Sequence, residues 1–256
     1  MKIASVKEIV SQSEWALRVD LAACYRLAAL YGWTDLIFTH ISAKLPEAGS
    51  NGQPEFLINP YGLLFEEITA SSLIKIDAEG RQLSASPFHV NRAGFIIHSA
   101  VHSAREDATC VIHTHTRAGV AVSAQRQGIL PISQQATLLL DSLGYHTYEG
   151  VAVHEEEQAR LQHDLGSNQC LILRNHGLLA VGPTIADAFM NMYTLESACQ
   201  IQLAAQSGGE LTMIPAEVLQ GVSAAVDLMD GGVSRGQQAW PALLRRLDRV
   251  NPGYDA

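Results

Sequence analysis

The sequence contains few cysteines. It has four, at positions 24, 110, 170 and 199, and none of them belongs to a CxxC pair. Widely spaced cysteines of this kind indicate reduced, buried thiols and argue against a disulfide framework or a cysteine-based zinc site. The sequence also contains no P-loop, no GxGxxG and no GxSxG motif, so the chemistries that these motifs mark have no support here.

Basic residues are scarce as well. Lys and Arg number 17 against 26 Asp and Glu, which gives a net charge of −9, and no Lys/Arg cluster offsets this balance. We therefore expect neither nucleic acid nor an anionic membrane as a partner. The N-terminal segment MKIASVKEIVSQSEW has no apolar stretch of the kind that signal peptides contain, and the chain has no apolar run of about 18 residues. We expect a cytoplasmic protein.

The composition is that of a globular protein. Hydrophobic residues make up 47% of the 256 residues and charged residues 17%. Helical patterns occur over residues 13–31, 91–104 and 185–206, and short apolar runs predict strands at 36–42, 56–59, 73–77, 109–113, 170–173 and 178–181. This pattern predicts one α/β domain over residues 1–209, followed by a C-terminal extension of short helices over residues 210–256.

His113 and His115, at the end of the run TCVIHTH, form the sharpest group among the ten histidines. Residues i and i+2 of a strand project from the same face, so both imidazoles can reach one metal ion. His176 is the best candidate for a third ligand, because it lies in a turn between two apolar runs. The spacing alone fits structural, hydrogen-bonded histidines and a polar turn residue equally well.

His98 and His102 stand four residues apart in the predicted helix 91–104, a spacing that can also ligate a metal. They belong to no HExxH motif, and apolar residues such as Ile97 flank them. We therefore predict that they pack at the interface of the helix and hydrogen-bond to the backbone.

Four segments stand out by their order and spacing: THISAK, LINPYGLLFEEITASSLIKID, NRAGFIIHSAVHSAREDATCVIHTHTRAGVAVSA and LILRNHGLLAVG. Together they resemble the class II aldolase/adducin family, and specifically its adducin-like branch, from about Glu14 to Gly208. The resemblance implies a three-layer α/β/α fold with a central, mainly antiparallel sheet, and a cyclic tetramer with active sites at subunit interfaces. It also implies a divalent ion, zinc first with manganese, iron or cobalt as alternatives, on His113, His115 and His176.

The chain departs from the aldolases of this family at three places. Gly94 replaces the glutamate that moves a proton, a Thr-His pair with His40 replaces Gly-Asn, and Tyr61-Gly62 replaces Thr-Gly. The candidates for proton transfer are therefore His40, Arg92, Tyr61 or a metal-bound water, and Gly62 and Gly94 are expected to line the substrate site. We also expect Gly94 to leave an open volume in which Arg92 binds a substrate carboxylate.

Three functional hypotheses follow. The favoured one is a divalent-metal-dependent lyase, aldolase- or decarboxylase-like, that cleaves a small oxygen-rich and carboxylated metabolite through a metal-stabilised enolate. The alternatives are a non-catalytic, adducin-like binding or scaffold protein and a true sugar-phosphate aldolase or epimerase, which Gly94 disfavours. A scaffold needs no metal ligands, so the three histidines discriminate between the first two.

The C-terminal extension predicts self-association. Its apolar residues have no obvious place in a domain that ends near Gly209, so we expect a homotetramer in which they cover a subunit interface: Trp240, Leu243, Leu244 and Tyr254.

Overall fold

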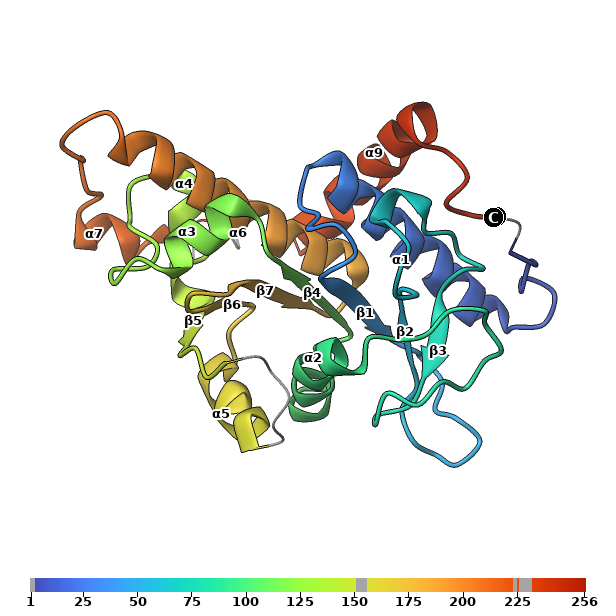
Figure 1. Ribbon diagram of the computed structural model, residues 1–256. Coiled ribbons are helices and arrows are strands. Elements are labelled where there is room, and N and C mark those ends of the chain that lie inside the picture. The colour runs from blue at the N-terminus through green and yellow to red at the C-terminus, as the bar shows by residue number, and fades with distance from the viewer. Residues whose placement is uncertain (1–2, 151–155, 223–224, 226–231) are drawn as a thin grey trace.

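The computed structural model describes residues 3–150, 156–222, 225 and 232–256, and for residues 92, 93 and 156 the backbone alone. Its strands form a sheet in the order β3-β2-β1-β4-β7-β6-β5 (Figure 1). The strands are β1 (His40–Lys44), β2 (Phe56–Ile58), β3 (Ile74–Ile76), β4 (Cys110–Thr114), β5 (Leu143–His146), β6 (Cys170–Leu173) and β7 (Gly177–Gly182). Neighbouring strands are antiparallel except for the parallel pair β5 and β6. The predicted mainly antiparallel sheet is confirmed.

Helices cover both faces of this sheet, which gives the predicted three-layer α/β/α architecture (Figure 1). One face carries α1 (Gln12–Leu30), α3 (Arg117–Ser123), α4 (Gln134–Thr137), α6 (Ile185–Gln206) and α9 (Arg235–Val250). The other face carries α2 (Arg92–Ala104) and α5 (Glu156–Leu165). Shorter elements are η1 (Phe65–Glu67), η2 (Leu140–Ser142) and α7 (Ala216–Leu219). Within the described ranges, no helix is both long and apolar enough to cross a membrane.

Strand alternation decides which side chains face which helical layer. In β4, Ile112 belongs to the main core beneath α1 and α6, whereas Val111 belongs to the second core beneath α2 and α5. Because successive residues point to opposite faces, His113 lies on the α2 side together with Val111. The same alternation in β1 turns His40 and Ser42 toward α2, where they hydrogen-bond to its side chains.

Helix ends follow the expected chemistry. The N-cap of α1 is Ser11, whose hydroxyl accepts a hydrogen bond from the Glu14 N–H. Gly32, with φ of 73°, follows the end of α1. Thr184 caps α6 by accepting from the Asp187 N–H, as its position before the long helical pattern indicates.

The predicted strand 36–42 is shorter than expected, because β1 begins only at His40. Leu36 and Thr39 have φ angles of 50° and 74°, in the left-handed region that is incompatible with an extended strand. The chain therefore turns before β1, and this turn presents Asp35 to the end of β4.

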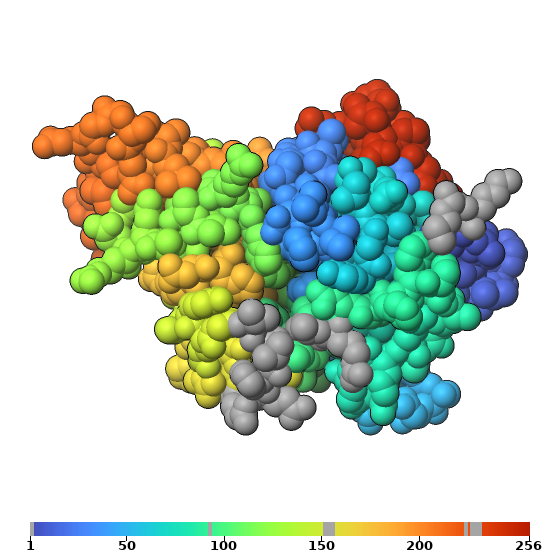
Figure 2. Space-filling model, viewed as in Figure 1, coloured from blue at the N-terminus to red at the C-terminus, as the bar shows by residue number. Residues whose placement is uncertain are grey.

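The C-terminal extension packs on its own chain. It contains α9, a 16-residue helix, where only short helices were predicted. Trp240 and Tyr254 are each 8% exposed and join the main core, and Leu243 and Leu244 pack against it. The premise that these apolar residues have no place in the domain is therefore wrong, whereas the position of the extension at a subunit interface stays a prediction. Figure 2 shows the red C-terminal segment against the blue N-terminal region, in keeping with contacts between α9 and α1.

Candidate metal centre

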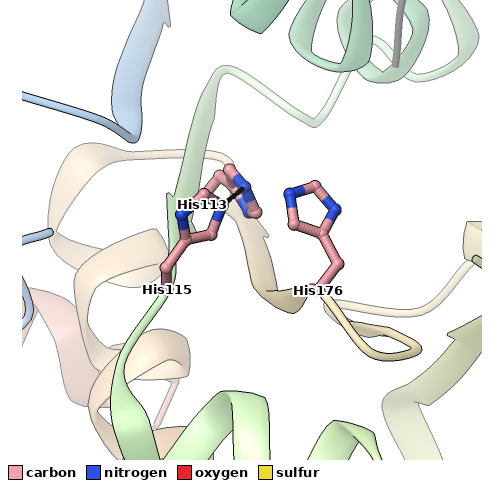
Figure 3. Close-up of side chains that lie close together, drawn as sticks. All are labelled: His113, His115 and His176. Atoms are coloured by element: carbon pink, nitrogen blue, oxygen red, sulfur yellow. Dashed lines mark hydrogen bonds between the residues drawn. The ribbon is translucent and has the colours of Figure 1, made fainter. Parts of the chain in front are cut away.

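Three histidines converge at one end of the central strands (Figure 3). His113 is the fourth residue of β4, His115 directly follows that strand, and His176 lies in the turn between β6 and β7. The Nε2 atoms of His113 and His115 are 2.9 Å apart, and each ligand nitrogen of the triad lies within 4.8 Å of the others. His176 faces the other two rings, with a centroid distance of 4.8 Å to each. This arrangement can hold one divalent ion.

The far sides of two of these rings are hydrogen-bonded. Nδ1 of His113 donates to the Leu178 carbonyl oxygen at 3.0 Å, and Nδ1 of His115 lies 3.1 Å from Oδ2 of Asp35. With the proton on Nδ1 of each ring, Nε2 of His113 and Nε2 of His115 keep their lone pairs for an ion between the three histidines. Metal-binding histidines use such outer carbonyl and carboxylate contacts to fix tautomer and ring orientation. The donor set therefore fits a divalent ion such as zinc.

Burial favours the neutral form of His113 and His176, the form that ligation requires. Burial, followed by the charges of protonated His115 and His146, lowers the pKa of His176 to about 4. Burial, followed by the charge of protonated His176, holds the pKa of His113 well below its usual range. A cation on this site would meet unprotonated nitrogens on His113 and His176 at neutral pH.

The turn that places His176 depends on close backbone approach. Leu173 pairs with Gly177 across the turn, and Asn175 adopts a φ of 57°, which asparagine tolerates better than most residues. A Cβ at Gly177 would lie 2.3 Å from the Thr114 carbonyl oxygen. Glycine at this position therefore lets the start of β7 lie against the end of β4 and brings His176 to the histidine pair.

His40 fills the space that Gly94 was expected to leave open. An ideal Cβ at position 94 would lie 2.0 Å from Nε2 and 2.3 Å from Cδ2 of His40, far inside contact distance. The expectation of an open volume at Gly94 is therefore wrong. His40 is 5% exposed and pairs with His113 across β1 and β4, and the two rings lie 5.6 Å apart, centroid to centroid. Burial, followed by the charges of protonated His115 and His176, lowers its pKa to about 3.

Tyr61 and Gly62, two further predicted site residues, come from a different part of the sheet than the triad. Tyr61 and Gly62 lie after β2, and β1 separates β2 from β4 in the sheet. Tyr61 is 40% exposed, and its backbone N–H donates to the His89 carbonyl oxygen. The side chain of Arg92 lies outside the described part of the structure, so its proposed contact with a carboxylate stays a prediction.

His98 and His102 are buried at the interface of α2 with the sheet, as predicted. His102 also has the expected backbone partner, because its Nδ1 lies 2.7 Å from the Ala108 carbonyl oxygen. His98 instead contacts two side chains, His40 and Ser42. Ser42 and Asp35 were not among the residues predicted for the site. Alternation from His40 along the strand could have indicated Ser42, whereas no local pattern marks Asp35.

The family of this chain is shown by comparison with known proteins. Residues 19–203 match the model of the Class II Aldolase and Adducin N-terminal domain, so the chain belongs to that family. A Pseudomonas aeruginosa protein that is provisionally named an aldolase class 2 protein is 59% identical over 98% of this chain and 96% of its own length. Alpha-adducin of Mus musculus is 42% identical over 95% of this chain, which spans only 34% of that protein.

Solved structures agree with this assignment. The chain is similar to an aldolase II superfamily protein from Pseudomonas syringae, with a TM-score of 0.90 and 46% identity over 99% of this chain and 100% of the other. It is also similar to L-fuculose 1-phosphate aldolase from Glaciozyma antarctica, with a TM-score of 0.79 and 26% identity over 99% and 96% of the two chains. Relatives of this chain therefore include both an enzyme and adducins.

Proposed function

We propose that this protein is a divalent-metal-dependent lyase that acts on a small, oxygen-rich and carboxylated metabolite. His113, His115 and His176 are the proposed ligands, with zinc as the first expectation and manganese, iron or cobalt as alternatives. A divalent ion on these residues would supply Lewis-acid stabilisation of negative charge on a substrate oxygen. The observation on which the proposal rests is the convergence of three imidazoles, two of which have their outer nitrogens hydrogen-bonded to Leu178 and Asp35.

The surroundings of His40 favour loss of carbon dioxide from a substrate over removal of a carbon-bound proton. The family's aldolases take a carbon-bound proton with a glutamate, and here Gly94 and the His40 imidazole stand in its place. A buried imidazole without a carboxylate partner among the described residues is a weak base. Loss of carbon dioxide requires no removal of a carbon-bound proton, because the breaking bond itself supplies the electron pair. His40 would then accept a hydrogen bond from a substrate hydroxyl and orient it.

Metal content is the first test. Wild-type protein reconstituted separately with zinc, manganese, iron and cobalt is dialysed and analysed by elemental analysis. We expect about one equivalent of one of these ions per chain. His176→Ala should lose the ion and stay folded, whereas His163→Ala, which alters an exposed histidine, should retain it. Well under one equivalent in the wild type with every ion would overturn the proposal.

Reaction type is the second test. Metal-loaded protein is incubated with a panel of small hydroxy and oxo carboxylates, and carbon dioxide release is measured. In parallel, exchange of the carbon-bound proton of dihydroxyacetone phosphate is followed by NMR in deuterated water. Release of carbon dioxide without exchange supports the proposal. Exchange at the rate of an authentic aldolase would instead establish a sugar-phosphate aldolase or epimerase.

A non-catalytic binding or scaffold function is the second candidate. The observation that favours it is the 42% identity with alpha-adducin over nearly the whole chain. Such a protein would need no ion on the triad. Absence of metal binding together with absence of turnover would support this candidate over the lyase.

A further inference from the structure

A row of buried polar side chains connects α2 to the sheet beside the histidine triad. His40 and Ser42 come from β1 and His98 and His102 from α2, and each is at most 5% exposed. Nδ1 of His40 lies 2.8 Å from Nε2 of His98, and the Ser42 hydroxyl lies 2.6 Å from Nδ1 of His98 and 2.7 Å from Nε2 of His102. The row ends where Nδ1 of His102 meets the Ala108 carbonyl oxygen at 2.7 Å.

The carbonyl at the end of this row sets the direction of every hydrogen bond in it. A carbonyl oxygen only accepts, so Nδ1 of His102 carries a proton and Nε2 of a neutral His102 accepts. The Ser42 hydroxyl therefore donates to His102 and accepts from Nδ1 of His98. Nε2 of His98 is then an acceptor, which requires the proton of His40 to lie on Nδ1. Nε2 of His40 is left with a lone pair.

This assignment holds only if the imidazoles of His40, His98 and His102 are neutral, and their environment favours the neutral state. No carboxylate in the described part of the chain hydrogen-bonds to any of them. Burial lowers the pKa of His102 to about 4 and holds the pKa of His98 well below its usual range. Charging a buried ring without a counter-ion is costly.

We propose that His98, Ser42 and His102 are positioning residues that hold His40 in the Nδ1–H tautomer and thereby present its Nε2 lone pair at the site beside the triad. Nε2 lies against Gly94 and has no hydrogen-bond partner among the described residues. Nε2 can then accept a hydrogen bond from a ligand donor, such as a hydroxyl of a hydroxy acid. Only this last step rests on the proposed function, because the tautomer is a property of the metal-free protein.

Removal of the Ser42 hydroxyl should reverse the tautomers of His98 and His40. In Ser42→Ala, Nδ1 of His98 has no acceptor, so His98 gains most by placing its proton on Nε2 and donating to His40. His40 must then accept through Nδ1 and carry its own proton on Nε2, which removes the lone pair from the site. Ser42→Thr keeps the hydroxyl and serves as the matched control.

The test reads the tautomers directly. Metal-free protein labelled with ¹⁵N in histidine is studied at neutral pH by long-range ¹H–¹⁵N correlation, and His40→Gln, His98→Gln and His102→Gln assign the signals. We expect protonated Nδ1 and unprotonated Nε2 for these three residues in the wild type. In Ser42→Ala, the His40 Nε2 signal should move into the protonated range, and in Ser42→Thr it should return.

Two results would overturn the inference. One is a protonated Nε2 on His40 in the wild type, a measurement that needs no variant to fold. The other is an unchanged His40 tautomer in a Ser42→Ala protein whose backbone amide spectrum shows the native fold. Neither depends on metal content or turnover, so failure of the lyase proposal and failure of this inference are separately visible.

Discussion

Nε2 of His40 lies 2.0 Å from where a Cβ at position 94 would stand, so His40 and Gly94 are structurally coupled. Position 94 lies in the first turn of α2, where the glycine has an ordinary negative-φ backbone. Glycine is therefore required at this position by the neighbouring ring and not by the backbone. The His40 ring occupies the space that a side chain at position 94 would need, so His40 and a glutamate at position 94 could not both fit in this arrangement.

The contact between His40 and Gly94 predicts that the effect of Gly94→Ala on the free energy of unfolding depends on His40. Gly94→Ala should lower the free energy of unfolding by roughly 1–3 kcal/mol, because the buried His40 ring must move. In a His40→Ala background the same substitution should be neutral or stabilising by up to about 1 kcal/mol, since alanine favours the helix. Urea unfolding of the four proteins measures both values. Equal effects in the two backgrounds would contradict the coupling.

Asp35 predicts an outer-sphere effect on metal affinity. It contacts the Nδ1 side of His115, so Asp35→Ala should free that ring and weaken metal binding about 10- to 100-fold without unfolding the protein. Competition with a chromophoric chelator measures the affinity. Asp107→Ala, which removes a carboxylate paired with Arg105 away from the triad, is the matched control and should bind as the wild type does. The same loss in both variants would point to a general charge effect.

His102 predicts that the metal-free protein loses stability in acid. Its pKa is about 4 in the folded protein against 6.5 ordinarily, so between these values the unfolded chain binds more protons. The free energy of unfolding should therefore fall as pH drops from 6.5 to 4, by about 3 kcal/mol from this residue. His102→Asn, which can still donate to the Ala108 carbonyl, should show a shallower fall, whereas His163→Ala should follow the wild type. Parallel profiles of unfolding free energy against pH for the wild type and both variants would refute the contribution of His102 to the loss of stability in acid.

Trp240 predicts that the C-terminal helix is part of the folded body. Trp240 is 8% exposed, and its Nε1 donates to Oδ1 of Asp20 at 3.0 Å. Trp240→Ala should lower the free energy of unfolding by roughly 3–5 kcal/mol, because it opens a cavity and leaves the half-buried Asp20 without this donor. Met213→Ala, at a side chain 45% exposed, should have little effect. A single cooperative transition shifted by the first substitution alone is the expected calorimetric result.

Self-association is expected on the turn before β1. Leu36 is 68% exposed and Phe38 45% exposed, and both follow shortly after Asp35, whose carboxylate contacts His115. We predict a homotetramer by light scattering, and dissociation by Leu36→Glu combined with Phe38→Glu, since charges at an apolar interface are costly. Ile9→Glu, at a residue 81% exposed, is the control. A monomeric wild type at micromolar concentration would refute the prediction.

The residue patterns by themselves predicted six of the strands, three of the helices and the candidate histidines, and the family resemblance implied the mainly antiparallel sheet and its two helical layers. Strand alternation places His113 and His115 on one side of a rigid strand end, and the short turn between two apolar runs places His176 at the same end. These are local consequences of backbone period and turn length, so residue order is sufficient to predict them. The family motifs reinforced the same residues.

Tertiary structure alone decided which groups lie beside the triad and how the C-terminal helix packs. His40 lies against Gly94, Asp35 meets His115, and Trp240 reaches Asp20 across 220 positions of sequence. Each of these contacts depends on how far two distant segments approach and on the volume of the side chain between them. No periodicity encodes such a distance, which is why the space beside Gly94 was predicted to be open and is filled by an imidazole.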